Sequence, residues 1–316
     1  MKKKLKLLGN LLTIGAVLLI IRKILSMDID FSQFGSRPLL SALGVSITVQ
    51  TAVITFGCIP WLIFIQSLSG RKIPFSEAMP VYTNSNIYKY IPGNVFQYIG
   101  RNQLAADMNI SHVDVACATI LDIFFSVLST GVISALLLGS KLAELLGKYG
   151  RNMLIIGGAG IALLIIAVII LKWKSSDKIK SYLMRYSKAF RPGNRRLLAL
   201  GVLYYFGQNF VSSMSYFICM RLVLGSDAGI GETLTLTGAF MFAWIIGFVT
   251  PGAPGGIGIR EAVMIYVSGD TFADKVMLFT LAMRIASTTA DVLAFLIGKL
   301  YLAVRADNVH RVKKQT

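Results

Sequence analysis

Histidine and cysteine are scarce in this chain of 316 residues, which has two histidines, His112 and His310, and three cysteines. Two histidines are too few for a His-based metal cluster, and we assign no nucleophile–His triad. The cysteines lie in apolar stretches without CxxC spacing, so they predict buried small side chains rather than disulfides or a zinc site. We therefore expect no metal, no cofactor and no catalytic residue.

Charge is also scarce, at 15% of residues against 55% hydrophobic, and the mean hydropathy is +0.67. Soluble domains carry about 25% charged residues. A helix needs about 20 mainly apolar residues to cross the hydrocarbon layer. The windows that meet this standard are residues 8–25, 39–65, 113–138, 153–171, 197–219 and 276–304. The sequence predicts an all-α polytopic membrane protein with about six full spans.

Positive charge is concentrated in the segments that alternating spans would place on one side of the membrane. The chain begins with four lysines among its first six residues, and nine lysines and arginines lie in residues 172–196. The first window resembles a signal peptide, but it is long and no small-x-small cleavage site follows before Asp28, so we predict a retained anchor. The positive-inside rule places both termini in the cytoplasm of a cell (inner) membrane.

This topology predicts a single transmembrane domain, residues 1–316, with pseudo-halves at about 1–171 and 197–304. The basic linker 172–196 is expected to lie on anionic head groups, and we do not expect nucleic acid as a partner of this net +17 chain.

Two segments do not resemble simple spans. Residues 74–112 are interrupted by asparagine, proline and glycine around Pro92 and Gly93, and residues 231–269 are interrupted at 250–258. Non-helical backbone at membrane depth is tolerated only where it is buried in protein or lines a wet cavity. We predict two re-entrant or broken helical hairpins.

The two interruptions resemble each other. Pro92-Gly93 is followed after seven residues by Arg101, and Pro251-Gly252 after seven residues by Arg260, 159 positions later. Paired interrupted segments in opposite halves are typical of an inverted repeat with a binding site between the halves. We therefore predict such a repeat.

A glycine-rich break before a helix favours anions, because it exposes unpaired N–H groups at the positive end of the helix dipole. Gly255, Gly256 and Gly258 allow close approach of the backbone, and the planar fork of Arg260 suits a phosphate. The alternative is that these glycines serve only tight helix packing.

Ionisable residues inside the predicted spans need a partner or a water-filled cavity, since each costs at least about 2.5–3.5 kcal/mol in a bilayer. Asp122, Arg284 and Asp291 are of this kind. One interpretation is a structural ion pair of Arg284 or Arg260 with Asp122, Asp291 or Glu261. The other is a charged cavity in which the acids orient the arginines or carry protons.

Lys89 and Arg101 flank the first interruption, and Tyr88, Tyr90 and Tyr98 lie near them. Tyrosines close to a membrane boundary usually form an interfacial belt, and we expect that role here.

The run Lys89-Tyr90-Ile91-Pro92-Gly93-Asn94, with Gly100-Arg101 after it, resembles the first signature of the flippase-like membrane family. That family includes the transmembrane domain of lysylphosphatidylglycerol synthase, the multiple peptide resistance factor. The run from Thr250-Pro251-Gly252 to Gly256-Ile257-Gly258-Ile259-Arg260-Glu261-Ala262 resembles the second signature. Arg284 stands where members commonly carry an arginine. The resemblance implies lipid translocation; aminoacylation is not expected, because no soluble synthase domain follows the last span.

The expected function is transport, by a flippase or scramblase, of a lipid with an anionic phosphate head group. Aminoacyl-phospholipids and polyprenyl-phosphate-linked sugars are the lipids considered. No ATP-binding Gly-rich loop is present in the sequence, so direct ATP drive by that route is not expected. The predicted substrate-binding residues are Lys89, Pro92, Gly93, Arg101, Pro251, Gly252, Gly255, Gly256, Gly258, Arg260, Glu261 and Arg284.

Two other functions compete with transport. One is a membrane glycosyltransferase that uses a polyprenyl-phosphate sugar donor, with Asp28 and Asp30 as its acidic motif. The other is an assembly subunit of envelope glycan or lipid synthesis. A homo-oligomer and envelope-biosynthesis enzymes are the protein partners considered.

Overall fold

The computed structural model describes residues 36–91, 95–139, 141–144, 190–249 and 259–315. All regular elements of these residues are helices. By length and composition alone, four helical segments of this described part could cross a membrane: Arg37–Ser69, His112–Leu138, Ile230–Phe248 and Thr271–Arg305. The all-helical class is confirmed, and these helices are consistent with a membrane protein. The predicted spans 8–25 and 153–171, with Asp28 and Asp30, lie outside the described residues.

The predicted window 197–219 forms helix α9 (Arg195–Leu224), but α9 is not among the four apolar segments found in the described residues. Its two adjacent amides, Gln208 and Asn209, lower its mean hydropathy. Helix α10 (Ile230–Val249) is one of the four, although the sequence predicted that it forms part of a broken hairpin. By length and composition, the candidate spans of the described residues thus include α10 and not α9.

The first long apolar segment is broken at Gly57 into α2 (Arg37–Phe56) and α3 (Cys58–Ser69). Pro60 has no N–H to bond the carbonyl four residues earlier, that of Phe56. The Tyr204 hydroxyl of α9 donates to that carbonyl at 3.0 Å. The break is thus satisfied by a bond from a neighbouring helix.

The first interrupted segment is a helical hairpin. Helix α4 (Phe75–Asn86) continues as the 3-10 turn η2 (Ile87–Tyr90), and α5 (Phe96–Leu104) forms the second arm. A Cβ at Gly100 would lie 2.2 Å from the Tyr88 ring, so glycine permits the close contact of the two arms.

The second interrupted segment lies between α10 and α11 (Ile259–Gln315), and its break, 250–258, lies outside the described residues. Helix α11 is itself divided at Gly269, whose φ of +62° and ψ of −171° are not helical. A positive φ of this kind favours glycine. Gly269 therefore separates a short arm that carries Arg260 from the long segment Thr271–Arg305.

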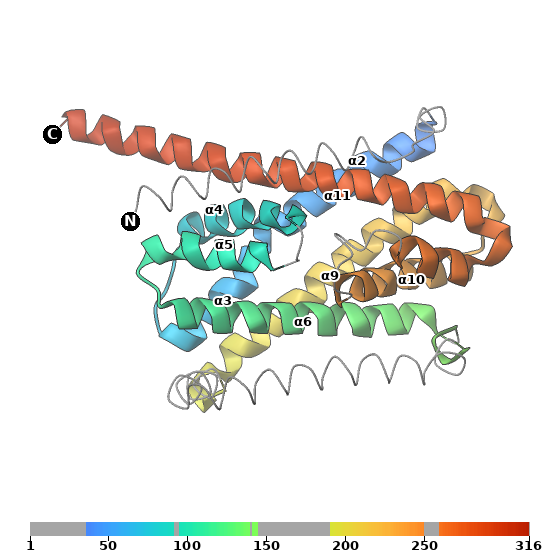
Figure 1. Cartoon of the computed structure of the whole chain (residues 1–316), viewed down its shortest axis with the longest axis horizontal. Coiled ribbons are helices and arrows are strands. Elements are labelled where there is room, and N and C mark those ends of the chain that lie inside the picture. The colour runs from blue at the N-terminus through green and yellow to red at the C-terminus, as the bar shows by residue number, and fades with distance from the viewer. Residues whose placement is uncertain (1–35, 92–94, 140, 145–189, 250–258, 316) are drawn as a thin grey trace.

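The α4–α5 hairpin and α10 lie toward opposite ends of the molecule, each between α11 and α6 (His112–Leu138) (Figure 1). Helix α4 packs on α11 and α5 on α6, whereas α10 packs on both long helices. One apolar cluster joins α2, α9, α10 and α11 around Phe240 and Phe279. A second joins α3, α4, α6 and α9 around Trp61 and Phe64.

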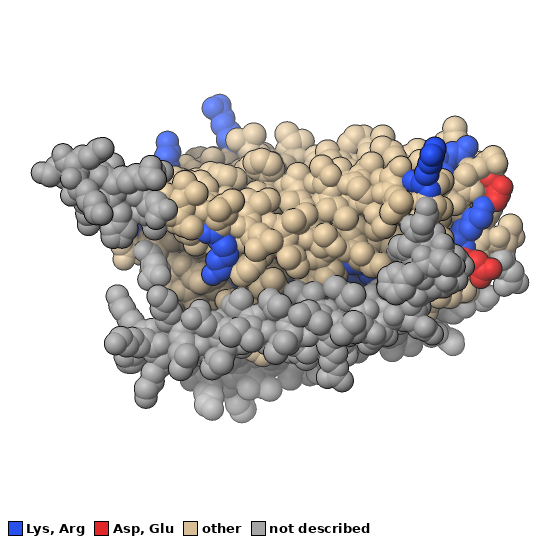
Figure 2. All heavy atoms as spheres, turned by 90° about the horizontal axis from the view of Figure 1, so that it is seen from above, with Lys and Arg blue, Asp and Glu red and all other residues tan. Residues whose placement is uncertain are grey.

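Large apolar side chains are exposed along the outside of α6, α9 and α11, for example Leu136, Leu203 and Leu300. On the face in Figure 2, the described charged side chains gather mainly toward the two ends of the long axis. An apolar exterior between charged ends is the pattern that a bilayer requires.

Gly238 marks the closest approach of α10 to α6. A Cβ there would lie 2.8 Å from both the Leu137 Cβ and the Leu138 backbone nitrogen, and the Ser134 hydroxyl donates to the Gly238 carbonyl at 2.8 Å. Because backbone cannot move aside as a side chain end can, we expect Gly238→Ala to destabilise the protein by about 1–3 kcal/mol.

Thermal unfolding in detergent measures this effect. Gly44→Ala in α2 is the matched control, since nothing lies within 4 Å of a Cβ at Gly44. Equal stability of the two variants would contradict the close packing of α10 on α6.

Candidate functional site

A cavity of about 510 Å³ lies among the described helices and is lined by residues of α2, α4, α5, α6, α9, α10 and α11. The helices that line this cavity also contribute residues to the two apolar clusters. Its lining includes six of the residues predicted from the sequence to be charged site residues: Lys89, Arg101, Asp122, Arg260, Arg284 and Asp291. Six charged residues from segments far apart in the sequence thus line the same cavity.

Arg101 and Asp122 form a buried ion pair. The Arg101 Nη1 lies 2.8 Å from the Asp122 Oδ2, and the two side chains are only 3% and 6% exposed. The Tyr205 hydroxyl also donates to Asp122, and the Tyr82 hydroxyl donates to it at 3.3 Å. The Arg101 guanidinium lies 3.8 Å from the centre of the Tyr82 ring. Aromatic stacking and an ion pair therefore hold both charges in fixed positions.

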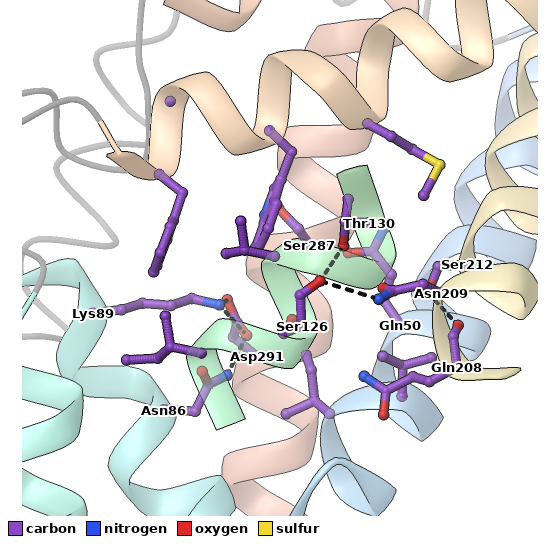
Figure 3. A pocket seen from close by; sticks show the side chains of 18 of the residues that line it. Gln50, Asn86, Lys89, Ser126, Thr130, Gln208, Asn209, Ser212, Ser287 and Asp291 are labelled. Carbon is purple, nitrogen blue, oxygen red and sulfur yellow. Dashed lines mark hydrogen bonds and ion pairs between the residues drawn. The ribbon is translucent and has the colours of Figure 1, made fainter. Parts of the chain in front are cut away.

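Asp291 joins the first hairpin to α11. Its carboxylate accepts hydrogen bonds from the Asn86 amide at 2.7 Å, from the Lys89 ammonium at 2.8 Å and from the Tyr90 hydroxyl at 2.6 Å (Figure 3). Asp291 is buried, whereas the Lys89 side chain is about one-third exposed. Three donors from consecutive turns of one hairpin thus converge on one acid of another helix.

Arg284 forms a bidentate pair with Glu261 across the Gly269 break. The Arg284 Nε lies 2.5 Å from Oε1 and Nη2 lies 2.9 Å from Oε2. This is one of the pairs expected from the sequence. The expected pairs of Asp122 and Asp291 with Arg284 or Arg260 are wrong, since Arg101 and Lys89 take those positions. The closer partners come from the first hairpin, whose position relative to α6 and α11 the sequence does not encode locally.

Arg260 differs from the other three cations. Within the described part of the chain it forms no ion pair, and its Nε is buried without a hydrogen-bond partner. Its electrostatic neighbours there are Arg284, Tyr216, Glu261 and Tyr90, and Glu261 is already bidentate with Arg284. A buried donor without a partner is uncommon in proteins and needs an explanation.

The sequence did not single out most of the neutral polar residues that line the cavity, among them Gln50, Ser126, Thr130, Gln208, Asn209 and Ser212. A signal was present, because Asp122, Ser126 and Thr130 recur every four residues along one face of the otherwise apolar α6. A polar stripe on an apolar helix predicts a buried hydrophilic surface.

The tyrosines near the first hairpin do not form the interfacial belt that we expected. Tyr88 is buried against Gly100, Tyr90 bonds Asp291, and Tyr98 lines the cavity. Their side chains face the interior because the hairpin packs against α11 and α6.

Seven predicted site residues lie outside the described residues: Pro92, Gly93, Pro251, Gly252, Gly255, Gly256 and Gly258. No group of three or more metal-ligating side chains occurs within the described ranges.

Comparison of the chain with protein families, curated proteins and solved structures gives no match.

Proposed function

We propose that this protein transports a lipid whose anionic phosphate head group enters the cavity while its tail stays in the bilayer. The observation that carries this proposal is the surplus positive charge of Arg260 inside a cavity whose other described charges are paired. The resemblance of the two interrupted segments to the flippase-like family points the same way.

The charges of the site pair off as Lys89 with Asp291, Arg101 with Asp122 and Arg284 with Glu261. Arg260 remains without an acid among the described residues. A guanidinium away from bulk water attracts an anion strongly, and its fork can bond two phosphate oxygens. Such a group reduces the unfavourable free energy of moving a phosphate out of water.

The order of elements supports the proposed inverted repeat. Each half has a helix, then an interrupted segment that carries an arginine in its second arm, then a long helix. These are α2–α3, α4–α5 and α6 in the first half, and α9, α10 with the arm before Gly269, and Thr271–Arg305 in the second. Arg101 and Arg260 line the same cavity. The proposal places this cavity between the two halves in a cell membrane, with both termini in the cytoplasm.

The proposal assigns different roles to the two motif arginines. Arg101 is held by Asp122 and the Tyr82 ring, so its role is to shape the cavity and contribute to its potential. Arg260 is the group that contacts the phosphate.

Reconstitution in liposomes with head-group-labelled lipids tests the proposal. The labelled head group is reduced or digested on the outer leaflet, and the fraction that becomes accessible with time is measured. We expect Arg260→Ala to slow movement of an anionic phospholipid by about tenfold or more, since a charged hydrogen bond contributes about 1.5–3 kcal/mol. We expect Arg260→Lys to retain part of the activity, because it keeps the charge and loses the fork.

Lys141→Ala is the matched control, because it removes one positive charge from an exposed pair with Glu144 outside the cavity lining. Equal head-group movement with wild type, with Arg260→Ala and with protein-free vesicles would reject transport. Intact cellular function of Arg260→Ala together with Arg101→Ala would favour an assembly subunit instead.

A further inference from the structure

The cavity lining combines charged residues with neutral amides and hydroxyls. Figure 3 shows Lys89 and Asp291 on one side and the amides Gln50, Gln208 and Asn209 on the other. The hydroxyl residues of α6 lie between them (Figure 3). A phosphate held at Arg260 leaves the amides available to a further group of the same ligand.

The hydrogen bonds of Gln50 and Asn209 fix which amide atoms remain available. The Gln50 Nε2 donates at 2.5 Å to the Ser46 hydroxyl, whose own proton goes to the Met283 sulfur. The Asn209 Nδ2 donates at 2.6 Å to the Ser129 hydroxyl, whose own proton goes to a backbone carbonyl of α6. Each amide therefore donates at least one N–H to protein, and its oxygen can accept from a ligand.

Gln208 adds a third acceptor of the same kind. Its Oε1 is buried and has no hydrogen-bond partner among the described residues. The buried Gln208 oxygen thus requires a donor, and the oxygens of Gln50 and Asn209 can accept from the same ligand. Hydroxyl groups and ammonium groups are two kinds of donor that a lipid head group can supply.

The carboxylates decide between these donors. Asp122 is engaged by Arg101 and two tyrosine hydroxyls, and Asp291 by Lys89, an amide and a hydroxyl. No lining carboxylate of the described residues is without a cationic partner. An ammonium in this cavity would find no free carboxylate among the described lining residues, and the positive charge of Arg260 would repel it. Neutral hydroxyls meet no such penalty.

We infer that the cavity selects a phosphate head group substituted with uncharged hydroxyl groups, of the glycerol or sugar type, over head groups that carry an amine. The phosphate lies at Arg260 and the hydroxyls donate to the amide oxygens of Gln50, Gln208 and Asn209. This inference rests on the proposed function and names the substrate class of the same site. It excludes aminoacyl-phospholipids from the lipids considered above.

The test compares three lipids with the same acyl chains in the liposome assay. Phosphatidylglycerol has a phosphate and hydroxyls, phosphatidylethanolamine has a phosphate and an ammonium, and phosphatidic acid has a phosphate alone. We expect phosphatidylglycerol to move about tenfold faster than phosphatidylethanolamine. We expect Gln208→Leu to slow phosphatidylglycerol by about tenfold, the effect of one lost buried hydrogen bond, and to leave phosphatidic acid unchanged.

Gln103→Leu is the control, because it removes an amide from an exposed position on α5. Equal rates for phosphatidylglycerol and phosphatidylethanolamine would overturn the inference, as would a Gln208→Leu variant that slows phosphatidic acid equally. If Gln208→Leu does not fold, Asn209→Leu and the wild-type comparison decide the question.

Two further outcomes separate this inference from the proposed function. Absence of movement for all three lipids rejects the proposed function itself, whereas movement without preference rejects only the hydroxyl assignment. The last measurement adds free glycerol 3-phosphate to the liposome assay as a competitor. Slowing of phosphatidylglycerol by this competitor supports recognition of the head group, and its uptake without movement of any lipid would overturn the assignment of a lipid.

Discussion

Asp122→Ala is expected to destabilise the protein by about 3–5 kcal/mol, because it leaves the Arg101 guanidinium buried without its acid. Arg101 is only 3% exposed, and Asp122 is its ion-pair partner. Two tyrosine hydroxyls, those of Tyr82 and Tyr205, lose their acceptor at the same time. Thermal unfolding in detergent, or unfolding by increasing fractions of denaturing detergent, measures the loss.

Two controls show whether the loss comes from the unpaired charge. Asp227→Ala breaks an ion pair with Lys275 in which both side chains are exposed, and such pairs contribute about 0–1 kcal/mol. The double variant Arg101→Met with Asp122→Leu removes both charges and should recover much of the stability, as apolar replacements of buried pairs often do. A loss no larger than that of Asp227→Ala would contradict the structure around Asp122.

Asp291→Ala is expected to release the first hairpin from α11 and to destabilise the protein by about 3 kcal/mol, since three donors lose one buried acceptor. The effect should be local. Hydrogen exchange of the backbone is expected to rise sharply in α4, η2 and α5, and to change little in α9. Exchange measured by mass spectrometry on peptides from these elements checks the prediction.

Glu77→Ala is the matched control for this variant. The Glu77–Arg305 pair also joins α4 to α11, at 3.2 Å, but both side chains are exposed. Its loss should leave the protection of the hairpin almost unchanged. A uniform rise in exchange across all helices of Asp291→Ala would show that Asp291 supports the whole fold rather than the hairpin.

The sequence predicted the all-helical class and three of the apolar segments because lipid imposes a strong and local compositional requirement. It also selected the charged residues that line the cavity, since a charge inside an apolar window must face a partner or water. Asp122, Arg284 and Asp291 were found in this way.

The pairing of those charges could not be predicted. Asp122 pairs with Arg101 and Asp291 with Lys89 because α4 and α5 lie between α6 and α11, and that position depends on packing of the whole chain. The amides of α2 and α9 were missed for a related reason. One or two amides in an apolar helix are not a strong local signal. Their role can be recognised only once the structure shows that they face the cavity.

The ion pair between Glu77 and Arg305 is a reference point from which the depth of other residues along α4 and α11 can be counted. With that pair at the head-group boundary, Asp291 lies fourteen residues into α11, or about 21 Å along a helix that rises 1.5 Å per residue. Lys89 lies twelve residues from Glu77, which is about 18 Å if the chain stays helical. The hydrocarbon layer is about 30 Å thick. In the proposed transport, and with that boundary, a head group at Lys89 and Asp291 lies more than halfway across the hydrocarbon layer.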